Sequence, residues 1–215
     1  MKYNKKKYYW DKYYFKNKKS FPRSSFANFC FKKYIKNKKK DKRLIDLGCG
    51  NGRDTIFFSK KINSLGVDRS QEAIINLKKK YFYDKNLSFK LGDFDKINFK
   101  TIGKFDYIYL RFVFHAIKEN IQKRIIKNIK YLMKKKCTVM AEFRTDKDPL
   151  KKLGKKLSES ERFTDHYRRF INLEKFINHL ERGSYKVIYV IEKKDLSIFK
   201  KDNPVLARVI FTKQS

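Results

Sequence analysis

A glycine-rich segment at residues 46–52 constrains the fold of this chain more than any other feature. It reads Asp-Leu-Gly-Cys-Gly-Asn-Gly, overlaps the end of the apolar run Arg43–Leu47 and precedes a stretch with helical character. A short apolar run that ends in glycines is typical of a buried strand. Glycines at that point allow a sharp turn and a close approach of the backbone to a ligand, and the following helix start offers free N–H groups. The segment therefore predicts a ligand-binding turn between a buried strand and a helix.

Strands and helices are expected to alternate along the rest of the chain. The pattern predicts further strands at 64–67, 87–91, 105–112, 137–143, 185–191 and 205–211, and helices at 53–61, 70–81, 117–132 and from 172 onward. Such alternation produces right-handed crossovers and a parallel sheet with helices on both faces. The last two strands lack a helix between them, so we expect an antiparallel hairpin at one edge. The predicted fold class is α/β, an open doubly wound sheet that binds its ligand at the carboxyl ends of the first strands.

Two segments fall outside this alternation. Residues 144–170 are polar, and we expect them to be irregular. The first forty residues are rich in Lys, Tyr and Phe, and we expect two short helices around Pro22 that pack on the main domain. The sequence thus predicts an N-terminal helical segment, 1–40, and a main domain, 41–215.

Acidic residues stand at the ends of three predicted strands. Asp46 precedes the first glycine of the turn, and it would repel the pyrophosphate that a dinucleotide loop holds; Arg53 also replaces the third glycine of that motif. An acid directly before the glycine turn suits a ligand with an ammonium group next to a carboxylate. Asp68 ends the second strand, where an acid can accept hydrogen bonds from ribose hydroxyls. Asp93 and Phe94 follow the third strand, where they can bind an exocyclic amine and cover a purine ring. The alternatives are a glycine turn without a ligand, a helix-capping Asp68 and an ordinary turn at Asp93.

These motifs resemble the class I S-adenosylmethionine-dependent methyltransferases, especially small-molecule members such as the tellurite and thiopurine methyltransferases. The resemblance rests on residues 46–54, 66–74 and 92–93. It implies a Rossmann-like fold with a seven-stranded, mostly parallel sheet in the order 3-2-1-4-5-7-6, the last strand being antiparallel. It also implies S-adenosylmethionine as the cofactor. The segments Tyr9-Trp10-Asp11 and Ser25-Phe26-Ala27 resemble the aromatic N-terminal part that covers the cofactor in those enzymes.

The resemblance assigns the cofactor-binding residues one by one. Asp46, Gly48 and Gly50 would line the methionine part, Asp68 the ribose, and Asp93 with Phe94 the adenine. The complete set that we expect also contains Cys49, Asn51, Arg53, Arg69 and Arg111.

The methyl acceptor must be inferred from residue chemistry, because the family does not fix it. If the predicted fold is right, three arginine-containing stretches of the chain meet at the carboxyl edge of the sheet. Arginine in a chain rich in Lys indicates binding of an anion, since a guanidinium group binds a carboxylate or phosphate with two hydrogen bonds. We therefore predict a small anionic acceptor, such as a sugar phosphate or a sugar acid. The predicted acceptor-binding residues are Arg111, Glu142, Arg144, Arg168 and Arg169, and the candidate catalytic residues are His115, His166 and Tyr167. The alternative is that the arginines pair with Glu142, Asp146 and Asp165 and have a structural role.

The formal net charge of +34 has two readings. A polyanionic partner, such as RNA or an anionic membrane surface, would explain it. Codon bias in an AT-rich genome would explain it equally, and the even spread of Lys along the chain favours this second reading. A methyltransferase acting on RNA and a non-catalytic module tethered to nucleic acid or membrane are therefore the competing functions. No Asn/Asp-Pro-Pro-aromatic motif follows the fourth strand, which argues against methylation of base amino groups.

Length and composition exclude several other classes. The 215 residues suit one domain, and 41% hydrophobic residues supply enough core material for a folded chain. Three scattered cysteines favour neither a disulfide framework nor zinc, and no residues have metal-ligand spacing. No apolar run reaches the roughly 18 residues of a membrane helix, and the basic N-terminus lacks the apolar region of a signal peptide. We expect a cytoplasmic protein, and the sequence does not indicate its oligomeric state.

Overall fold

The computed structural model describes residues 4–17, 22–94 and 96–214, with only the backbone described for residues 4–8. The N-terminal segment 1–40 that the sequence predicts therefore lies partly outside the described residues. The chain divides into two compact units, Met1–Asn98 and Phe99–Ser215.

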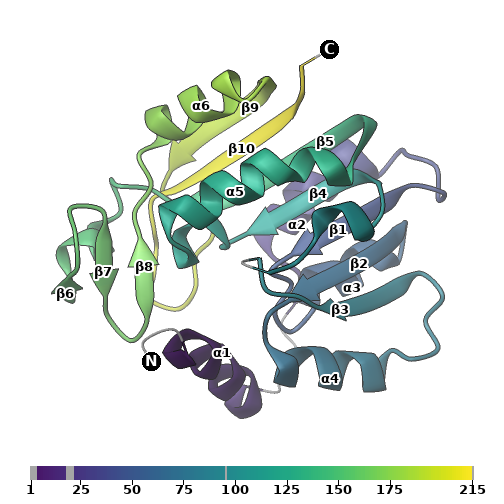
Figure 1. The fold of residues 1–215 in the computed structure, drawn as a ribbon, viewed down its shortest axis with the longest axis horizontal. Helices are drawn as coiled ribbons and strands as arrows, with labels where there is room; N and C mark the ends of the chain where they lie inside the picture. The colour runs from purple at the N-terminus through teal and green to yellow at the C-terminus, as the bar shows by residue number, and fades with distance from the viewer. Residues whose placement is uncertain (1–3, 18–21, 95, 215) are drawn as a thin grey trace. The chain divides into compact units, whose positions relative to one another are not determined.

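Seven strands form one mixed sheet in the order β3-β2-β1-β4-β5-β10-β9 (Figure 1). Strand β10 is antiparallel to both β5 and β9. Because β9 and β10 are the sixth and seventh strands of this sheet along the chain, the order confirms the predicted 3-2-1-4-5-7-6 topology. The strands are β1 (Arg43–Leu47), β2 (Asn63–Asp68), β3 (Leu87–Leu91), β4 (Phe105–Arg111), β5 (Met133–Arg144), β9 (Tyr185–Lys193) and β10 (Leu206–Lys213).

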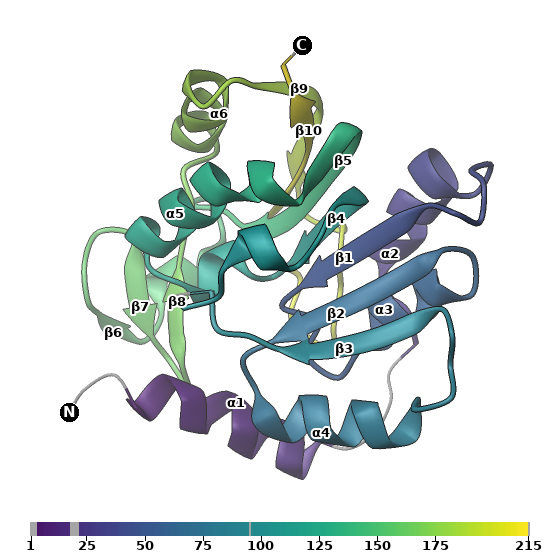
Figure 2. The same ribbon diagram turned by 45° about the vertical axis from the view of Figure 1, so that its right-hand side comes forward.

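In the first unit, two crossovers cover the same face of β1, β2 and β3. Helix α3 (Arg53–Ser59) connects β1 to β2, and α4 (Gln71–Lys80) connects β2 to β3. Both crossovers step in the same direction, so their right-handedness puts both helices on one face (Figure 2). Ser70 caps α4, its hydroxyl accepting a hydrogen bond from the Ala73 N–H at 3.3 Å.

The N-terminal segment forms two helices on either side of Pro22, as predicted. Helix α1 (Asn4–Lys16) lies beside α4 in both views, and α2 (Ser25–Cys30) continues into a π-helical turn, Phe31–Ile35 (Figures 1 and 2). Two carboxylates attach this segment to the rest of the unit. Asp11 accepts a hydrogen bond from the Ser70 hydroxyl at 2.7 Å. Asp54, at the start of α3, accepts from the N–H and the hydroxyl of Ser24, both at 2.7 Å.

In the second unit, helices α5 (Glu119–Ile129) and α6 (Leu173–Arg182) flank the strands β4, β5, β10 and β9. Asn172 caps α6, its side chain accepting from the Lys175 N–H at 2.9 Å. The rings of Phe114, Phe143 and Phe176 pack together, with 4.6 Å between the centroids of the last two. Short 3-10 turns complete the unit: η2 (Phe99–Thr101), η3 (Phe114–Ala116), η4 (Lys130–Leu132) and η5 (Pro149–Lys152).

Three expectations about this unit were wrong, and one of them is the start of β5, which begins at Met133 rather than at residue 137. Residues 144–170 are not irregular, because they contain a three-stranded antiparallel sheet of β6 (Lys155–Lys156), β7 (Glu161–Phe163) and β8 (Tyr167–Arg169). These strands are two or three residues long, too short for a hydrophobic period to be visible. Strand β4 ends at Arg111 rather than Phe112, since Phe112 has a positive φ of 61°.

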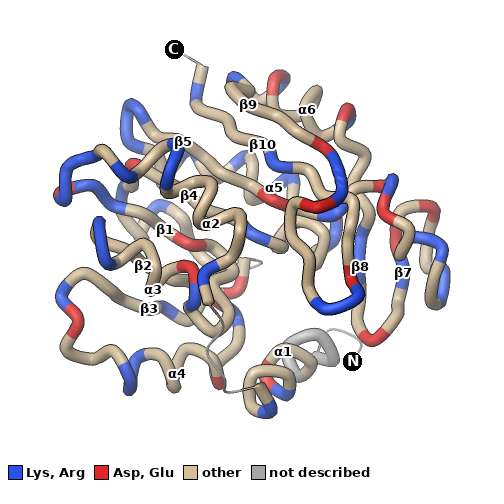
Figure 3. Tube along the Cα trace, turned by 180° about the vertical axis from the view of Figure 1, so that it is seen from behind, with Lys and Arg blue, Asp and Glu red and all other residues tan. Residues whose placement is uncertain are grey.

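Lys and Arg residues occur on helices, strands and loops of both units (Figure 3). They do not mark out one segment of the trace, which agrees with the even spread of Lys in the sequence. Among the described residues, no helix combines the length and the apolar character that crossing a membrane requires.

The two Ser24 bonds of Asp54 are expected to be a large local contribution to stability. Asp54→Ala removes both bonds and leaves a buried N–H without its partner, so unfolding should become easier by about 2–3 kcal/mol. The measurement is urea unfolding followed by circular dichroism. Asp84→Ala is the matched control, since Asp84 is exposed and its carboxylate accepts a local turn hydrogen bond from the Asn86 N–H. Equal unfolding midpoints for the two variants would contradict the assignment.

Candidate functional site

The glycine turn after β1 has a left-handed backbone. Gly48, Gly50 and Gly52 have φ values of 83°, 55° and 75°, a region that residues with a Cβ rarely adopt. The N–H groups of Gly48 and Cys49 both donate to the Val67 carbonyl, at 2.7 and 3.1 Å. The turn is therefore held against the end of β2, and glycines are required for its shape.

Two buried carboxylates flank this turn. Asp46 accepts a hydrogen bond from the Thr55 hydroxyl at 2.6 Å. Asp68 accepts from the N–H groups of Gly50 and Ser70, both at 2.8 Å, through different oxygens. Burial raises the pKa of Asp68, and these two N–H groups partly oppose that effect. The carboxyl ends of β1 and β2 thus bring together two of the acids that the sequence singles out.

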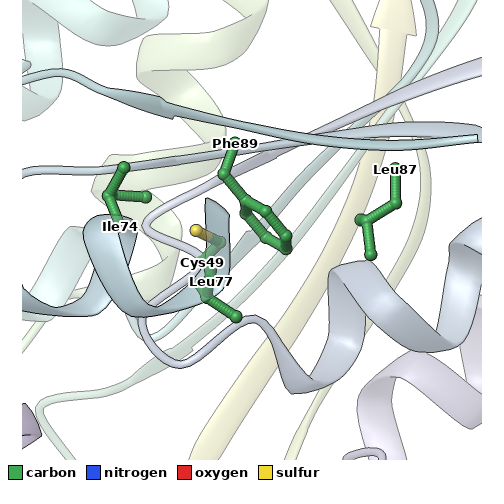
Figure 4. Packing of buried hydrophobic residues seen from close by; sticks show 5 residues of the cluster. All are labelled: Cys49, Ile74, Leu77, Leu87 and Phe89. Carbon is green, nitrogen blue, oxygen red and sulfur yellow. The ribbon is translucent and has the colours of Figure 1, made fainter. Parts of the chain in front are cut away.

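The Cys49 side chain belongs to the core of the first unit. It packs in an apolar cluster between α4 and β3, with Ile74, Leu77, Leu87 and Phe89 (Figure 4). Burial raises the pKa of its thiol well above the usual range. Only the backbone of Cys49 can therefore contribute to a ligand site at the turn.

The other predicted cofactor residues of this unit lie near the same strand ends. Asn51 belongs to the turn, and Arg53 begins α3 with its Nε 3.8 Å from Asp54. Arg69 follows Asp68, and its buried Nε has no hydrogen-bond partner among the described residues. Asp93 starts a turn in which its carbonyl accepts from the N–H groups at positions 96 and 97. Phe94 is buried, with 7% of its surface exposed.

Tyr14 is a residue that sequence reasoning missed. It comes from α1, and a Cβ built on Gly50 would overlap its hydroxyl oxygen. Burial raises the pKa of Tyr14 well above its usual range, and the nearby Asp68 adds to the effect. Its spacing of four residues from Trp10 puts both rings on one face of the helix, where they stack at 6.1 Å. That spacing was the available signal.

In the second unit, the predicted acceptor residues converge on the carboxyl ends of β4 and β5. Glu142, fully buried in β5, accepts from Arg111 at 3.0 Å and from Arg208 of β10 at 2.7 Å. Arg111 also donates to the Ser197 hydroxyl at 2.9 Å, and its guanidinium carbon lies 4.0 Å from the centre of the Phe112 ring.

The remaining three arginines have internal partners. Arg144 pairs with Asp148 at 2.8 Å and with Asp202. Arg168 pairs with Asp165 at 2.5 Å and contacts the Thr164 hydroxyl. Arg169 donates to Gln122 and to the carbonyls of Ile117 and Phe114.

The three candidate catalytic residues have distinct environments. His115 lies in η3 and its Nδ1 accepts the Arg144 N–H at 3.2 Å. Its pKa is lowered well below the usual value by burial and by surrounding cations. Burial and Arg168 lower the pKa of His166, although Asp165 lies 3.0 Å from its Nδ1. Tyr167 donates to Glu161, and burial together with that carboxylate raises its pKa.

Residues 38–202 match the family model described as a methyltransferase domain. No curated protein is similar enough in sequence to match the chain. Three solved structures share the fold at low identity. An S-adenosylmethionine-dependent methyltransferase from Clostridium acetobutylicum has a TM-score of 0.70 at 16% identity, over 89% of this chain and 92% of that one. A TehB-like methyltransferase from Corynebacterium glutamicum has a TM-score of 0.64 at 18% identity, over 89% and 88%. The glycopeptide N-methyltransferase MtfA in complex with S-adenosylmethionine has a TM-score of 0.67 at 12% identity, over 90% and 88%.

The lowered pKa of His115 predicts a loss of stability in acid. The unfolded chain takes up a proton on this side chain below its ordinary pKa of about 6.5, whereas the folded chain does not. Stability is therefore fully present above about pH 6.5 and falls as the pH drops, by up to about 1.4 kcal/mol per pH unit for one histidine. Unfolding free energies at pH 7.5 and 5.5 should show a smaller pH effect in His115→Asn than in the parent chain. An identical pH effect would contradict the buried neutral histidine.

Proposed function

The chain belongs to the methyltransferase domain family and is an S-adenosylmethionine-dependent methyltransferase, and from that premise we propose that it methylates a small anionic acceptor bound by Arg111. Charge balance among the arginines supports this choice. Arg144 faces two carboxylates and Arg168 faces one, whereas Arg111 shares the single carboxylate of Glu142 with Arg208. Two guanidinium groups therefore bind the one carboxylate of Glu142.

Arg111 also has unused donors. Its Nε and one Nη bind Glu142 and Ser197, while its Nη1 makes no hydrogen bond within the described residues. Its side chain is 15% exposed, compared with 8% for Arg208. A carboxylate or phosphate group can accept from both Nη1 hydrogens while Glu142 keeps the guanidinium in place. This free half of the guanidinium is the observation that carries the proposal.

The first unit contains donors and acceptors that fit the cofactor. The orphaned Nε of Arg69 is a buried donor that needs an acceptor, and Asp68 has lone pairs beyond those used by Gly50 and Ser70. Asp46 is an acid suited to the ammonium of the methionine part. We propose that these residues hold the cofactor together with the backbone of the turn 48–53 and with Asp93 and Phe94.

We also propose that α1, within the N-terminal segment 1–40, covers the cofactor. The support is the place of Tyr14 directly over Gly50, and the bond from Ser70 to Asp11 that fixes the helix there. The aromatic face formed by Trp10 and Tyr14 suits exclusion of water from the turn.

The chemistry follows from these assignments. S-adenosylmethionine supplies a methyl group on a positively charged sulfur, which departs as a neutral thioether when a lone pair of the acceptor attacks the carbon. An anionic oxygen is already deprotonated, so no protein base has to remove a proton. This agrees with the environments of His115 and Tyr167, whose shifted pKa values suit neither for that task. Positioning and exclusion of water are then the main contributions of the protein.

Asp46→Ala tests the cofactor assignment. Removing the carboxylate should weaken S-adenosylmethionine binding by about 100-fold, or about 2.7 kcal/mol, because the ammonium loses its charged partner. Isothermal titration calorimetry measures the dissociation constant, at low and high salt and with a short RNA as competitor. Thr55→Val is the control, since it removes the hydroxyl bonded to Asp46 but keeps the carboxylate. Unchanged binding in Asp46→Ala would exclude the assignment.

Arg111→Lys tests the acceptor class. The variant keeps the positive charge but loses the paired N–H donors of the guanidinium group. The KM for an anionic acceptor should therefore rise about 10-fold while cofactor affinity stays the same. Release of S-adenosylhomocysteine is measured with glucuronate and glucose 6-phosphate, and with glucose as the uncharged match. Arg168→Lys is the control, because the guanidinium group of Arg168 is already paired with Asp165, and this variant should leave the KM unchanged. Equal turnover of charged and uncharged sugars by the parent chain would overturn the anionic proposal.

A further inference from the structure

Phe112 has a strained backbone directly after β4. Its φ of 61° lies in the left-handed region, which is a genuine outlier for a bulky residue. The Phe112 N–H donates to the Glu142 carbonyl at 2.8 Å, so β5 holds the residue in this conformation. Strain of this kind persists only where the surroundings fix it, and it concentrates at functional sites.

The strained turn presents the ring of Phe112 to two polar side chains. The Arg111 guanidinium lies 4.0 Å from its centroid, and the imidazole of His115 meets it edge-on at 5.0 Å between centroids. One half-buried ring is therefore flanked by the proposed anion-binding group and by a histidine. This arrangement follows the carboxyl end of a central strand, where open α/β sheets bind their ligands.

The hydrogen bond at His115 fixes its tautomer. A backbone N–H can only donate, so the Nδ1 that receives the Arg144 N–H must be unprotonated. The proton of the neutral ring is then on Nε2, which makes no hydrogen bond within the described part of the chain. The charged and titratable groups facing His115 all oppose a second proton on it, and they are Arg111 of β4, Arg144 of β5, Arg168 of β8 and His166 just before β8.

We propose that His115 is not a general base but a fixed hydrogen-bond donor, whose Nε2–H orients the acceptor while Arg111 binds its negative charge. The inference rests on the proposed function for the identity of the acceptor. A carboxylate has two oxygens, so one can accept from Nε2–H while the other attacks the methyl carbon. A bond forms between that oxygen and the methyl carbon, the carbon–sulfur bond breaks, and its electron pair stays on sulfur.

Two substitutions at this position separate the donor from the structural role. In His115→Asn, the side-chain oxygen can replace Nδ1 and keep the Arg144 N–H satisfied, but nothing replaces Nε2–H. In His115→Gln, the longer side chain can bring an amide N–H to the place of Nε2. His179→Asn on α6 is the control for loss of a histidine, since this side chain contacts neither Phe112 nor Arg111 in the described structure.

The experiment combines spectroscopy with kinetics. Long-range ¹H–¹⁵N spectra of the whole chain should show His115 as the Nε2–H tautomer, unchanged from pH 6 to 8.5. With whichever sugar probe turns over, His115→Asn should lose about 30-fold or more in kcat/KM while keeping the thermal midpoint and the cofactor affinity of the parent. His115→Gln should recover part of the lost kcat/KM. The plot of kcat/KM against pH for the parent chain should show no inflection near the ordinary histidine pKa.

The outcomes that overturn the proposal are distinct from failure of the proposed function. A protonated Nδ1, a His115 that titrates in this range, or full activity in His115→Asn would exclude the donor role. Turnover of the uncharged sugar alone would exclude the anionic acceptor instead, and the variants would then be compared on that sugar. If the parent binds cofactor but methylates none of the probes, the ¹⁵N spectra still decide whether His115 can donate.

Discussion

The buried carboxylate of Glu142 determines the arrangement of the second unit. Burying a carboxylate costs several kcal/mol unless charged partners surround it. Glu142 meets this requirement with the guanidinium groups of Arg111 and Arg208, one on each neighbouring strand. Its backbone carbonyl also holds the strained Phe112. The positions of Arg111, Phe112 and Arg208, on or beside three strands of the sheet, therefore depend on this one residue.

Acidic residues have a similar anchoring role in the first unit. The chain has only 22 of them against 56 Lys and Arg, yet several are buried and bind backbone or hydroxyl groups. Asp54 holds Ser24, Asp68 holds the glycine turn, and Asp11 holds the start of α4. The scarce carboxylates thus fix the folded chain, while the excess of lysine stays on the surface and places little constraint on the structure.

Sequence reasoning succeeded where a signal is local. The bounds of β1 and β3 follow from apolar runs and turn residues, and the strand order follows from the resemblance to the class I methyltransferases. It missed β6, β7 and β8, which are stabilised by pairing with one another and have no apolar period. It also extended β4 by one residue, because the left-handed turn at Phe112 is imposed by its contacts and not by its own preference. Tyr14 was missed because its four-residue spacing from Trp10 indicates a shared helix face but not the segment that this face contacts.

The sequence by itself determined the fold, the glycine turn and the acids beside it, since strand periodicity and glycine chemistry are properties of neighbouring residues. The tertiary structure decided which charges are neutralised. Arg111, Arg144, Arg168 and Arg169 look equivalent in the sequence, yet the folded structure shows that three have internal partners and that Arg111 shares its acid with Arg208. The same holds for His115, whose tautomer depends on the backbone of a neighbouring strand. Arg111 with Glu142, Arg144 with Asp202, and Arg169 with Gln122 are pairs that lie 31 to 58 residues apart, so only folding brings these groups together.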